Sequence, residues 1–396
     1  MLLIIQSIIV YGLIIWTMTK FGNIAYRNQY PQGIDGIDMF QKREISFATL
    51  LTKSYFLIPI LIFCFFASVR YKVGVDCESY KEIFYDLGQF GISLRAPNIE
   101  PGFTFISNLI YSTTGTHYLF LFVLAFLQIY FLYYAQRRTT YSLKFFGIAL
   151  MLTGTYIALM NGIRQYIAAC ILVAFIPLLL KKKNWIWFIL VVLLATTMHK
   201  SAYMLIPIGI LSYALLKRGI PNIYTQYAIV VICYLLMDKI EIPFIDLISS
   251  FGGHAGYEAE VVEGYTKLEA TTKNFGFSSW LILLTQLIAI KYSQRMLMFN
   301  NNQSFNIIYN LFFIGVCISL LFYNNFTIGR LNYYFNIFYP IVLSIALFVM
   351  HSSKKKIDRD LFYITILLLT TSFIYNLFKA STIINESALY KFDFFN

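Results

Sequence analysis

The sequence contains little charge for its length. Only 13% of its 396 residues are charged and 59% are hydrophobic, whereas soluble proteins carry about 25% charged residues. Apolar runs of about 18 residues or more, long enough to cross a bilayer, recur along the chain. The composition excludes a soluble globular domain and indicates a polytopic helical membrane protein. It also excludes a transmembrane β-barrel, because barrel strands alternate apolar and polar residues and these runs do not.

The sequence is also poor in residues that bind metals or form disulfides. Its five cysteines and four histidines show none of the spacings of zinc sites or disulfide frameworks. No Asp-X-Asp or paired-His arrangement is present either. We therefore expect no metal site and no cofactor. The first apolar run lacks a basic leader and a small-residue cleavage site, so it is predicted to be a retained helix.

Acidic residues are outnumbered by basic ones, which gives a net charge of +12. In a soluble protein this excess would suggest a nucleic-acid partner. Here the Lys and Arg residues cluster in short loops between apolar runs, as the positive-inside rule requires of cytoplasmic loops. We therefore expect membrane lipid, and no nucleic acid, as a partner. The basic segments are 20–48, 137–138, 181–183, 217–218 and 354–356.

These basic loops predict a single integral membrane domain over residues 1–396, an all-α bundle of about twelve spans with both ends outside. The outer loop 70–116 is expected to contain a re-entrant or interfacial helix near 102–114. A second outer loop, 241–277, is an ordinary solvated loop or a lid. The expected spans are 2–19, 49–69, 117–135, 143–160, 163–180, 184–198, 201–216, 224–240, 278–295, 305–325, 330–353 and 361–378.

Several unusual polar residues are all predicted at the outer membrane boundary. Arg164 lies in a long apolar stretch, directly after the helix-breaking pair Asn161-Gly162. Because an arginine at a helix centre costs about 2.5–3.5 kcal/mol on insertion, it needs a partner or a ligand. We hypothesise that six such residues, from five segments, converge on one cavity. They are Arg70, Asp76, Glu100, Arg164, His199 and Arg330.

Two interpretations of these residues remain open. Arg70, Arg164 and Arg330 either reach lipid phosphates and neighbouring carboxylates or clamp an anionic ligand such as a diphosphate. Asp76 and Glu100 either form salt bridges with those arginines or orient and deprotonate a hydroxyl.

His199 follows the same pattern of alternatives. It is either a structural histidine or one that accepts a proton or orients a phosphate oxygen. In the loop 241–277, Tyr257 and Tyr265 would stack on sugar rings if the loop is a lid.

Five short motifs occur in a fixed order along the chain. They are Arg70-x3-Gly74-x-Asp76-x3-Tyr80, Glu100-Pro-Gly-Phe103, Asn161-x-Ile-Arg-Gln165, His199-x-Ser-Ala202 and a late Arg330. In this order the sequence resembles the EpsG-like branch of the Wzy-type bacterial polysaccharide polymerases. The resemblance implies a GT-C-like glycosyltransferase of the bacterial cytoplasmic (inner) membrane, with its active site on the periplasmic or extracellular face. The product would be O-antigen, capsule or exopolysaccharide.

The resemblance also implies a reaction. A growing glycan would pass from undecaprenyl diphosphate onto a lipid-linked oligosaccharide repeat unit, with a chain-length regulator and a flippase as further partners. Arg164, Arg330 and Arg70 would stabilise the leaving diphosphate, and the base would be Asp76, Glu100 or His199. The other substrate-binding residues would be Tyr80, Asn161, Gln165, Tyr257 and Tyr265.

Two alternatives to a polymerase share this diphosphate chemistry. One is an O-antigen ligase or another GT-C transferase of lipid-linked sugars, which differs in its acceptor. The other is a non-enzymatic flippase or transporter of lipid-linked oligosaccharide. A flippase is expected to hold cations at mid-depth in a central cavity, whereas the arginines here are predicted at one face.

Overall fold

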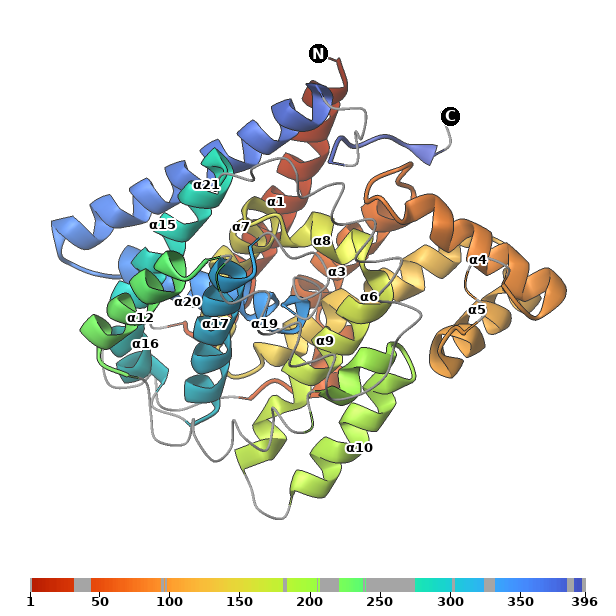
Figure 1. The fold of residues 1–396 in the computed structure, drawn as a ribbon, viewed down its shortest axis with the longest axis horizontal. Coiled ribbons are helices and arrows are strands. Elements are labelled where there is room, and N and C mark those ends of the chain that lie inside the picture. Colours follow the sequence, from red (N-terminus) through yellow and green to blue (C-terminus); the bar gives the residue numbers. More distant parts are fainter. Residues whose placement is uncertain are drawn as a thin grey trace.

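The computed structural model describes residues 2–31, 44–93, 98–180, 184–204, 221–237, 275–300, 303–323, 332–382 and 388–393, with the single positions 96, 206 and 239. Within these residues the chain is helical apart from turns and one isolated bridge between Arg70 and Phe392 (Figure 1). The predicted all-α class is therefore confirmed. The helices are α1 Leu2–Gln29, α2 Phe47–Thr52, α3 Ser54–Ser68, α4 Cys77–Phe90, α5 Pro101–Thr114, α6 His117–Ala135, η2 Thr140–Ser142, α7 Leu143–Leu152, α8 Thr155–Asn161, α9 Ile163–Phe175, η3 Ile176–Leu180, α10 Trp185–Thr196, η5 Lys200–Met204, α12 Ile223–Leu235, α15 Phe277–Lys291, α16 Ser293–Asn300, α17 Gln303–Leu321, α19 Tyr333–Asn336, α20 Phe338–His351 and α21 Lys356–Thr382.

Several of these helices are long and apolar enough to cross a bilayer. Five pass this test among the described residues: α1, α6, α17, the run α19–α20 and α21. The bent pair α7–α8 makes a sixth if it is one span, and five shorter apolar helices accompany them. The total number of spans and their sidedness stay predictions.

Helix α20 forms the centre of the bundle. Its side chains are buried from Phe338 to Met350, and it contacts α7, α17 and α21. A helix that is apolar all round is stable only when neighbours cover every face. Helix α20 is covered by helices from both the first and the second half of the chain. Helix α1 packs on α7 and α3, and α6 packs on α3 and α9.

Two breaks interrupt the middle of the bundle. Helices α7 and α8 are bent by 63° at Thr153 and Gly154, where Gly154 has φ +77°, a conformation that favours glycine. The predicted span 143–160 therefore consists of two helices that meet at a bend. The second break, at Gly162, separates α8 from α9 and places Arg164 in the first turn of α9, as predicted.

Helices α4 and α5 form a hairpin at the edge of the bundle (Figure 1). Each ends at a glycine with positive φ, Gly91 and Gly115, the usual way to close a helix. Helix α5 has 14 residues and rises only about 1.5 Å per residue, so it is shorter than the roughly 30 Å hydrocarbon core. Several helices at predicted spans are equally short, so the re-entrant or interfacial position of α5 stays a prediction.

Candidate functional site

Glu100 is the centre of a charged cluster. Its Oε2 accepts a hydrogen bond from Nη1 of Arg164 at 2.6 Å, and its Oε1 lies 3.0 Å from Nδ1 of His199. The backbone N–H of Lys200 donates to the same Oε1 at 3.1 Å. The Glu100 side chain is only 4% exposed, against 24% for Arg164 and 28% for His199. A buried carboxylate thus holds two cationic or protonatable groups that reach the surface.

The local sequence fixes where Glu100 lies. It is the residue before α5, with Pro101 at the first helical position, where a proline is favoured because it lacks an N–H. The next N–H groups, of Gly102 and Phe103, donate to the carbonyl of Thr197 at 2.9 and 3.4 Å. A Cβ on Gly102 would lie 2.4 Å from Oγ1 of Thr197. The glycine therefore lets the start of α5 dock against the end of α10, two residues before His199.

The surroundings of Glu100 settle its charge. Burial alone raises the pKa of this carboxyl, but the hydrogen bond from His199, the positive charge of Arg164 and the N–H of Lys200 lower it to about 2. Glu100 is therefore ionised at neutral pH, and an ionised carboxylate can only accept hydrogen bonds. Nδ1 of His199 therefore donates in their shared bond, and Nε2 is its other ring nitrogen.

Aromatic residues surround Arg164. Its guanidinium lies 5.7 Å from the ring centre of Phe103 and also hydrogen-bonds to the hydroxyl of Tyr80. The rings of Tyr80 and Phe103 are 6.0 Å apart. Glu100, Tyr80 and Phe103 thereby hold the guanidinium in one direction. Its exposed part remains available to an anion.

Helix α19 completes the surroundings of the cluster. The hydroxyl of Tyr334 is 2.9 Å from Oγ of Ser201, two residues after His199. Tyr333 stacks on Tyr166 of α9, with ring centres 4.9 Å apart. Segments far apart in the sequence, before α5, in α9, at η5 and in α19, therefore meet at one place.

Arg70 does not join this cluster. It is 1% exposed, and its guanidinium donates to the backbone carbonyls of Val73, Ala67 and Met160. Its distance to Met160 O is 3.4 Å, at the end of α8, where the helix break leaves carbonyls without helical partners. In this arrangement Arg70 supports backbone, and its predicted role as a diphosphate ligand stays a prediction.

Gln128 of α6 has a similar supporting position. Its Nε2 donates to the carbonyls of Leu159 and Ile163, at 2.9 and 3.3 Å. Non-helical backbone within a membrane bundle persists only where other groups satisfy it. Gln128 and Arg70 together stabilise the break that presents Arg164. No local sequence pattern indicated this role for Gln128, because its partners are more than 30 residues away.

Asp76 and Asn161 occupy supporting positions as well. Asp76 begins α4, and its backbone N–H donates to Oδ1 of Asn161 at 3.2 Å, which ties α4 to the α8–α9 break. Gln165 is 6% exposed. Arg330, Tyr257 and Tyr265 lie outside the described residues. Their predicted roles stay predictions, as do the loop 241–277 as a lid and the domain boundaries.

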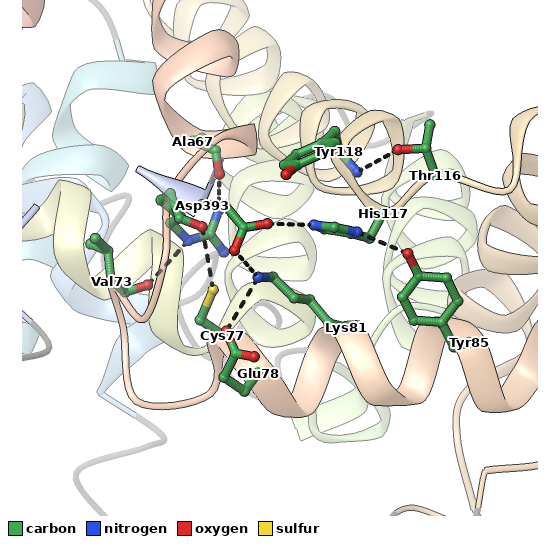
Figure 2. A network of polar contacts seen from close by, with 11 residues as sticks. Ala67, Val73, Cys77, Glu78, Lys81, Tyr85, Thr116, His117, Tyr118 and Asp393 are labelled. Atoms are coloured by element: carbon green, nitrogen blue, oxygen red, sulfur yellow. Dashed lines mark hydrogen bonds and ion pairs between the residues drawn. The ribbon is translucent and has the colours of Figure 1, made fainter. Parts of the chain in front are cut away.

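A second polar network, missed in the sequence, centres on Asp393 near the carboxyl end (Figure 2). Asp393 contacts Nζ of Lys81 at 2.6 Å and Nε2 of His117 at 2.9 Å, and Nδ1 of His117 reaches the Tyr85 hydroxyl at 3.0 Å. Burial raises the pKa of Asp393, but its bonds to Lys81 and His117 lower it overall. The residues around His117 contain no local sign of this network, because Asp393 is 276 residues away.

The Asp393 network fastens a short segment, residues 388–393, which we call the carboxyl strap. The strap pairs with the chain just before α4: Asp393 N–H donates to Val69 O, and Tyr71 N–H donates to Lys391 O, both at 2.9 Å. Tyr390 is fully buried and donates to Phe66 O at 2.7 Å. The strap thus holds α4, which carries Tyr80 toward Arg164.

No group of three His, Cys, Asp or Glu side chains with metal-binding geometry occurs in the part of the chain that the structure describes. The Glu100 cluster contains one carboxylate, one imidazole and one guanidinium, so its chemistry is that of an anion site with an adjacent base. It is suited to stabilising negative charge and to accepting a proton from a bound hydroxyl.

Fold and cluster together define a helical membrane protein in which a buried carboxylate, an arginine and a histidine meet at helix ends. A comparison with protein families then matches the EpsG family over residues 53–393. The chain belongs to the EpsG family, a Wzy-like polysaccharide polymerase family, and is a polysaccharide polymerase-type membrane protein. Comparisons with curated proteins and with solved structures found no match. The matched range includes the Glu100 cluster and extends to Asp393.

Proposed function

We propose that this protein is a GT-C-like glycosyltransferase that polymerises a bacterial polysaccharide at the outer face of the cytoplasmic membrane. It transfers a growing glycan from undecaprenyl diphosphate onto a lipid-linked oligosaccharide repeat unit. The observation that carries the proposal is the contact of one buried carboxylate, Glu100, with both Arg164 and His199, in a chain of the EpsG family. The product is an O-antigen, a capsule or an exopolysaccharide.

In this proposal Arg164 binds the diphosphate of the donor. A guanidinium stays charged in a site of low dielectric and can present two parallel N–H groups to phosphate oxygens. Glu100 and Tyr80 fix its direction before the substrate arrives, so the positive charge needs no reorganisation as the sugar–phosphate bond breaks. Arg330, which precedes α19 in the sequence, is proposed as a second diphosphate ligand.

His199 is the proposed base. A carboxyl with a pKa of about 2, such as Glu100, is a weak proton acceptor. Glu100 instead accepts the Nδ1 proton of His199 and leaves Nε2 free of hydrogen bonds to the described residues. The acceptor hydroxyl oxygen attacks the anomeric carbon, its proton passes to Nε2, and the carbon–oxygen bond to the diphosphate breaks. The electron pair of that carbon–oxygen bond leaves with undecaprenyl diphosphate.

The test is an elongation assay with the purified protein in detergent. A lipid-linked repeat unit is supplied together with a chelator of divalent metals, and the products are separated by size. Dimers and longer chains are expected. Transport of the lipid-linked unit in liposomes without any elongation would refute the polymerase and favour a flippase. Transfer only to an unrelated acceptor would indicate a ligase.

The variant Arg164→Ala is expected to abolish elongation, because the leaving diphosphate loses its positive partner. A matched control is Arg138→Ala, since Arg138 is 35% exposed and pairs with Glu44 in a loop predicted on the opposite face. Both variants are compared for membrane insertion and elongation. Normal chain growth by Arg164→Ala would remove this arginine from the mechanism.

A further inference from the structure

A separate polar cavity lies at the bend between α7 and α8. Its volume is ≈ 250 Å³, and residues of the bend, α9, α15, α17, α19 and α20 line it. The bend contributes Thr153 and Thr155, whose hydroxyls are 2.8 Å apart. Irregular backbone inside a membrane bundle is tolerated where it lines a cavity, and in transporters broken helices form substrate sites. The bend thus gives the cavity a polar wall.

The described lining of this cavity carries amides and hydroxyls but no charged side chain. Gln286 of α15 is 7% exposed. Neither its amide nor that of Asn336 in α19 has a hydrogen-bond partner among the described residues. A buried amide left without a partner costs about 1–3 kcal/mol. The buried amide of Gln286 therefore favours an occupant that offers donors and acceptors, and the half-buried amide of Asn336 can bond to the same occupant.

Aromatic rings supply the rest of the lining. Tyr166, Phe275, Tyr323 and Tyr339 all border the cavity. The face of an aromatic ring is electron-rich and suits the C–H groups on one side of a sugar. An acyl chain would leave the amides unsatisfied, and an anion would lie buried without a counter-charge. Amides, hydroxyls and rings without charge together match an uncharged sugar.

The cavity lies on the far side of α9 from the charged cluster. Tyr166 borders the cavity and follows Arg164 by two positions, which is roughly 200° around a helix of 3.6 residues per turn. The volume is slightly below the range of about 300–1,000 Å³ for pockets of drug-sized ligands. It therefore accommodates a single sugar ring rather than an oligosaccharide.

We infer that this cavity is a subsite for one uncharged sugar residue of the glycan, distant from the bond that is broken. The inference rests on the proposed function only in taking that sugar to belong to the substrate. Binding itself requires neither Arg164 nor turnover, so it can be measured without elongation.

Saturation-transfer NMR on the purified full chain tests the subsite. The detergent must be zwitterionic, because a maltoside headgroup is itself a sugar. The probes are glucose, galactose, N-acetylglucosamine and N-acetylgalactosamine, with glucuronic acid as the charged comparison. At least one neutral sugar is expected to bind more tightly than glucuronic acid. Gln286→Leu and Asn336→Leu should each weaken that binding about 3–10-fold, the loss of one hydrogen bond.

Arg164→Ala serves as the control, because it removes the diphosphate ligand and leaves the cavity intact. It should keep native sugar binding while losing elongation. The two proposals can fail separately. If the cavity variants lose sugar binding but the native protein does not elongate glycans, the subsite is supported and the polymerase reaction is refuted. The subsite is overturned if no neutral sugar binds, if glucuronic acid binds equally well, or if both cavity variants bind like the native protein.

Discussion

Replacing Glu100 by Gln should destabilise the protein by removing charge without changing shape. Glutamine keeps an acceptor oxygen for Lys200 N–H but loses the ion pair to Arg164. The pKa of Glu100 falls from 4.5 to about 2 in the folded protein, and because one pKa unit corresponds to about 1.36 kcal/mol, the ionised carboxylate gains about 3 kcal/mol. Removing one partner of a buried ion pair costs about 3–5 kcal/mol, a range that includes this value.

The assay is thermal unfolding of the detergent-solubilised protein. For chains of 150–250 residues 1 kcal/mol moves the Tm by about 2–4 °C, so Glu100→Gln should lower the Tm on the order of 5 °C. A double-mutant cycle with Arg164→Gln should give a coupling of about 1–3 kcal/mol. The control is a change elsewhere on α5, Ser112→Ala, because the Ser112 hydroxyl donates to Leu109 O of its own helix; this variant should show no coupling to Arg164.

The same carboxylate predicts a pH dependence. A pKa that is lower in the folded state means that the unfolded chain binds the proton first as the pH falls. The contribution of Glu100 is therefore complete above pH 4.5 and is lost as the pH falls toward about 2. Glu100→Gln should remove that part of the acid sensitivity. An unchanged Tm with zero coupling to Arg164 would refute the arrangement of the cluster.

Three further predictions concern other parts of the chain. His199→Gln should slow elongation about 10²–10⁴-fold in the ladder assay, the usual contribution of a general base, while the Tm falls less than in Glu100→Gln, because the glutamine amide can still donate to Glu100. Gly74→Ala should lower stability by about 1–3 kcal/mol in thermal unfolding, because Gly74 has φ +83° and a Cβ there would lie 2.9 Å from Met160 O. Asp393→Asn should cost about 1–3 kcal/mol and expose the carboxyl strap to limited proteolysis, because Lys81 and His117 lose their partner.

Each of these variants has a matched control or a result that contradicts it. Gly91→Ala shares a positive φ of 72° but meets no atom within 4 Å, so it isolates conformational strain from the clash at Gly74. Glu78→Gln alters a carboxylate that is 42% exposed and should change stability by less than about 1 kcal/mol. If Asp393→Asn behaves like Glu78→Gln, the strap is not held by its ion pairs. Native elongation rates in His199→Gln would exclude it as the base.

Local sequence signals predicted much of the candidate site. The pair Glu100-Pro101 predicted a helix start, and Glu100 does precede α5. The pair Asn161-Gly162 predicted a helix break, and Arg164 does lie in the first turn of the following helix, α9. The convergence of Glu100 with Arg164 and His199 followed from the predicted sidedness, and the structure brings these three together.

Long-range contacts limited the rest of the prediction. Arg70 has the same sequence context as an anion ligand, and only the position of Met160, 90 residues away, shows that it supports backbone. The sequence near Asp393 contains no sign of Lys81 or His117. The bend at Gly154 was missed because Thr-Gly-Thr within an apolar run is compatible with a continuous membrane helix. Such features depend on tertiary packing, which short patterns do not encode.

The carboxyl strap has a consequence for how the protein is assembled in the cell. Its Tyr390 N–H donates to Ser7 Oγ and its Ala388 carbonyl accepts from Tyr11, contacts that join positions 383 and 377 residues apart. Contacts at such separations form late, after every intervening helix has been synthesised and inserted. The amino-terminal helix therefore lacks these partners until the carboxyl strap has been synthesised. The anchoring of α4 is thereby linked to synthesis of the strap, so a chain terminated before residue 388 is inserted without its anchored α4.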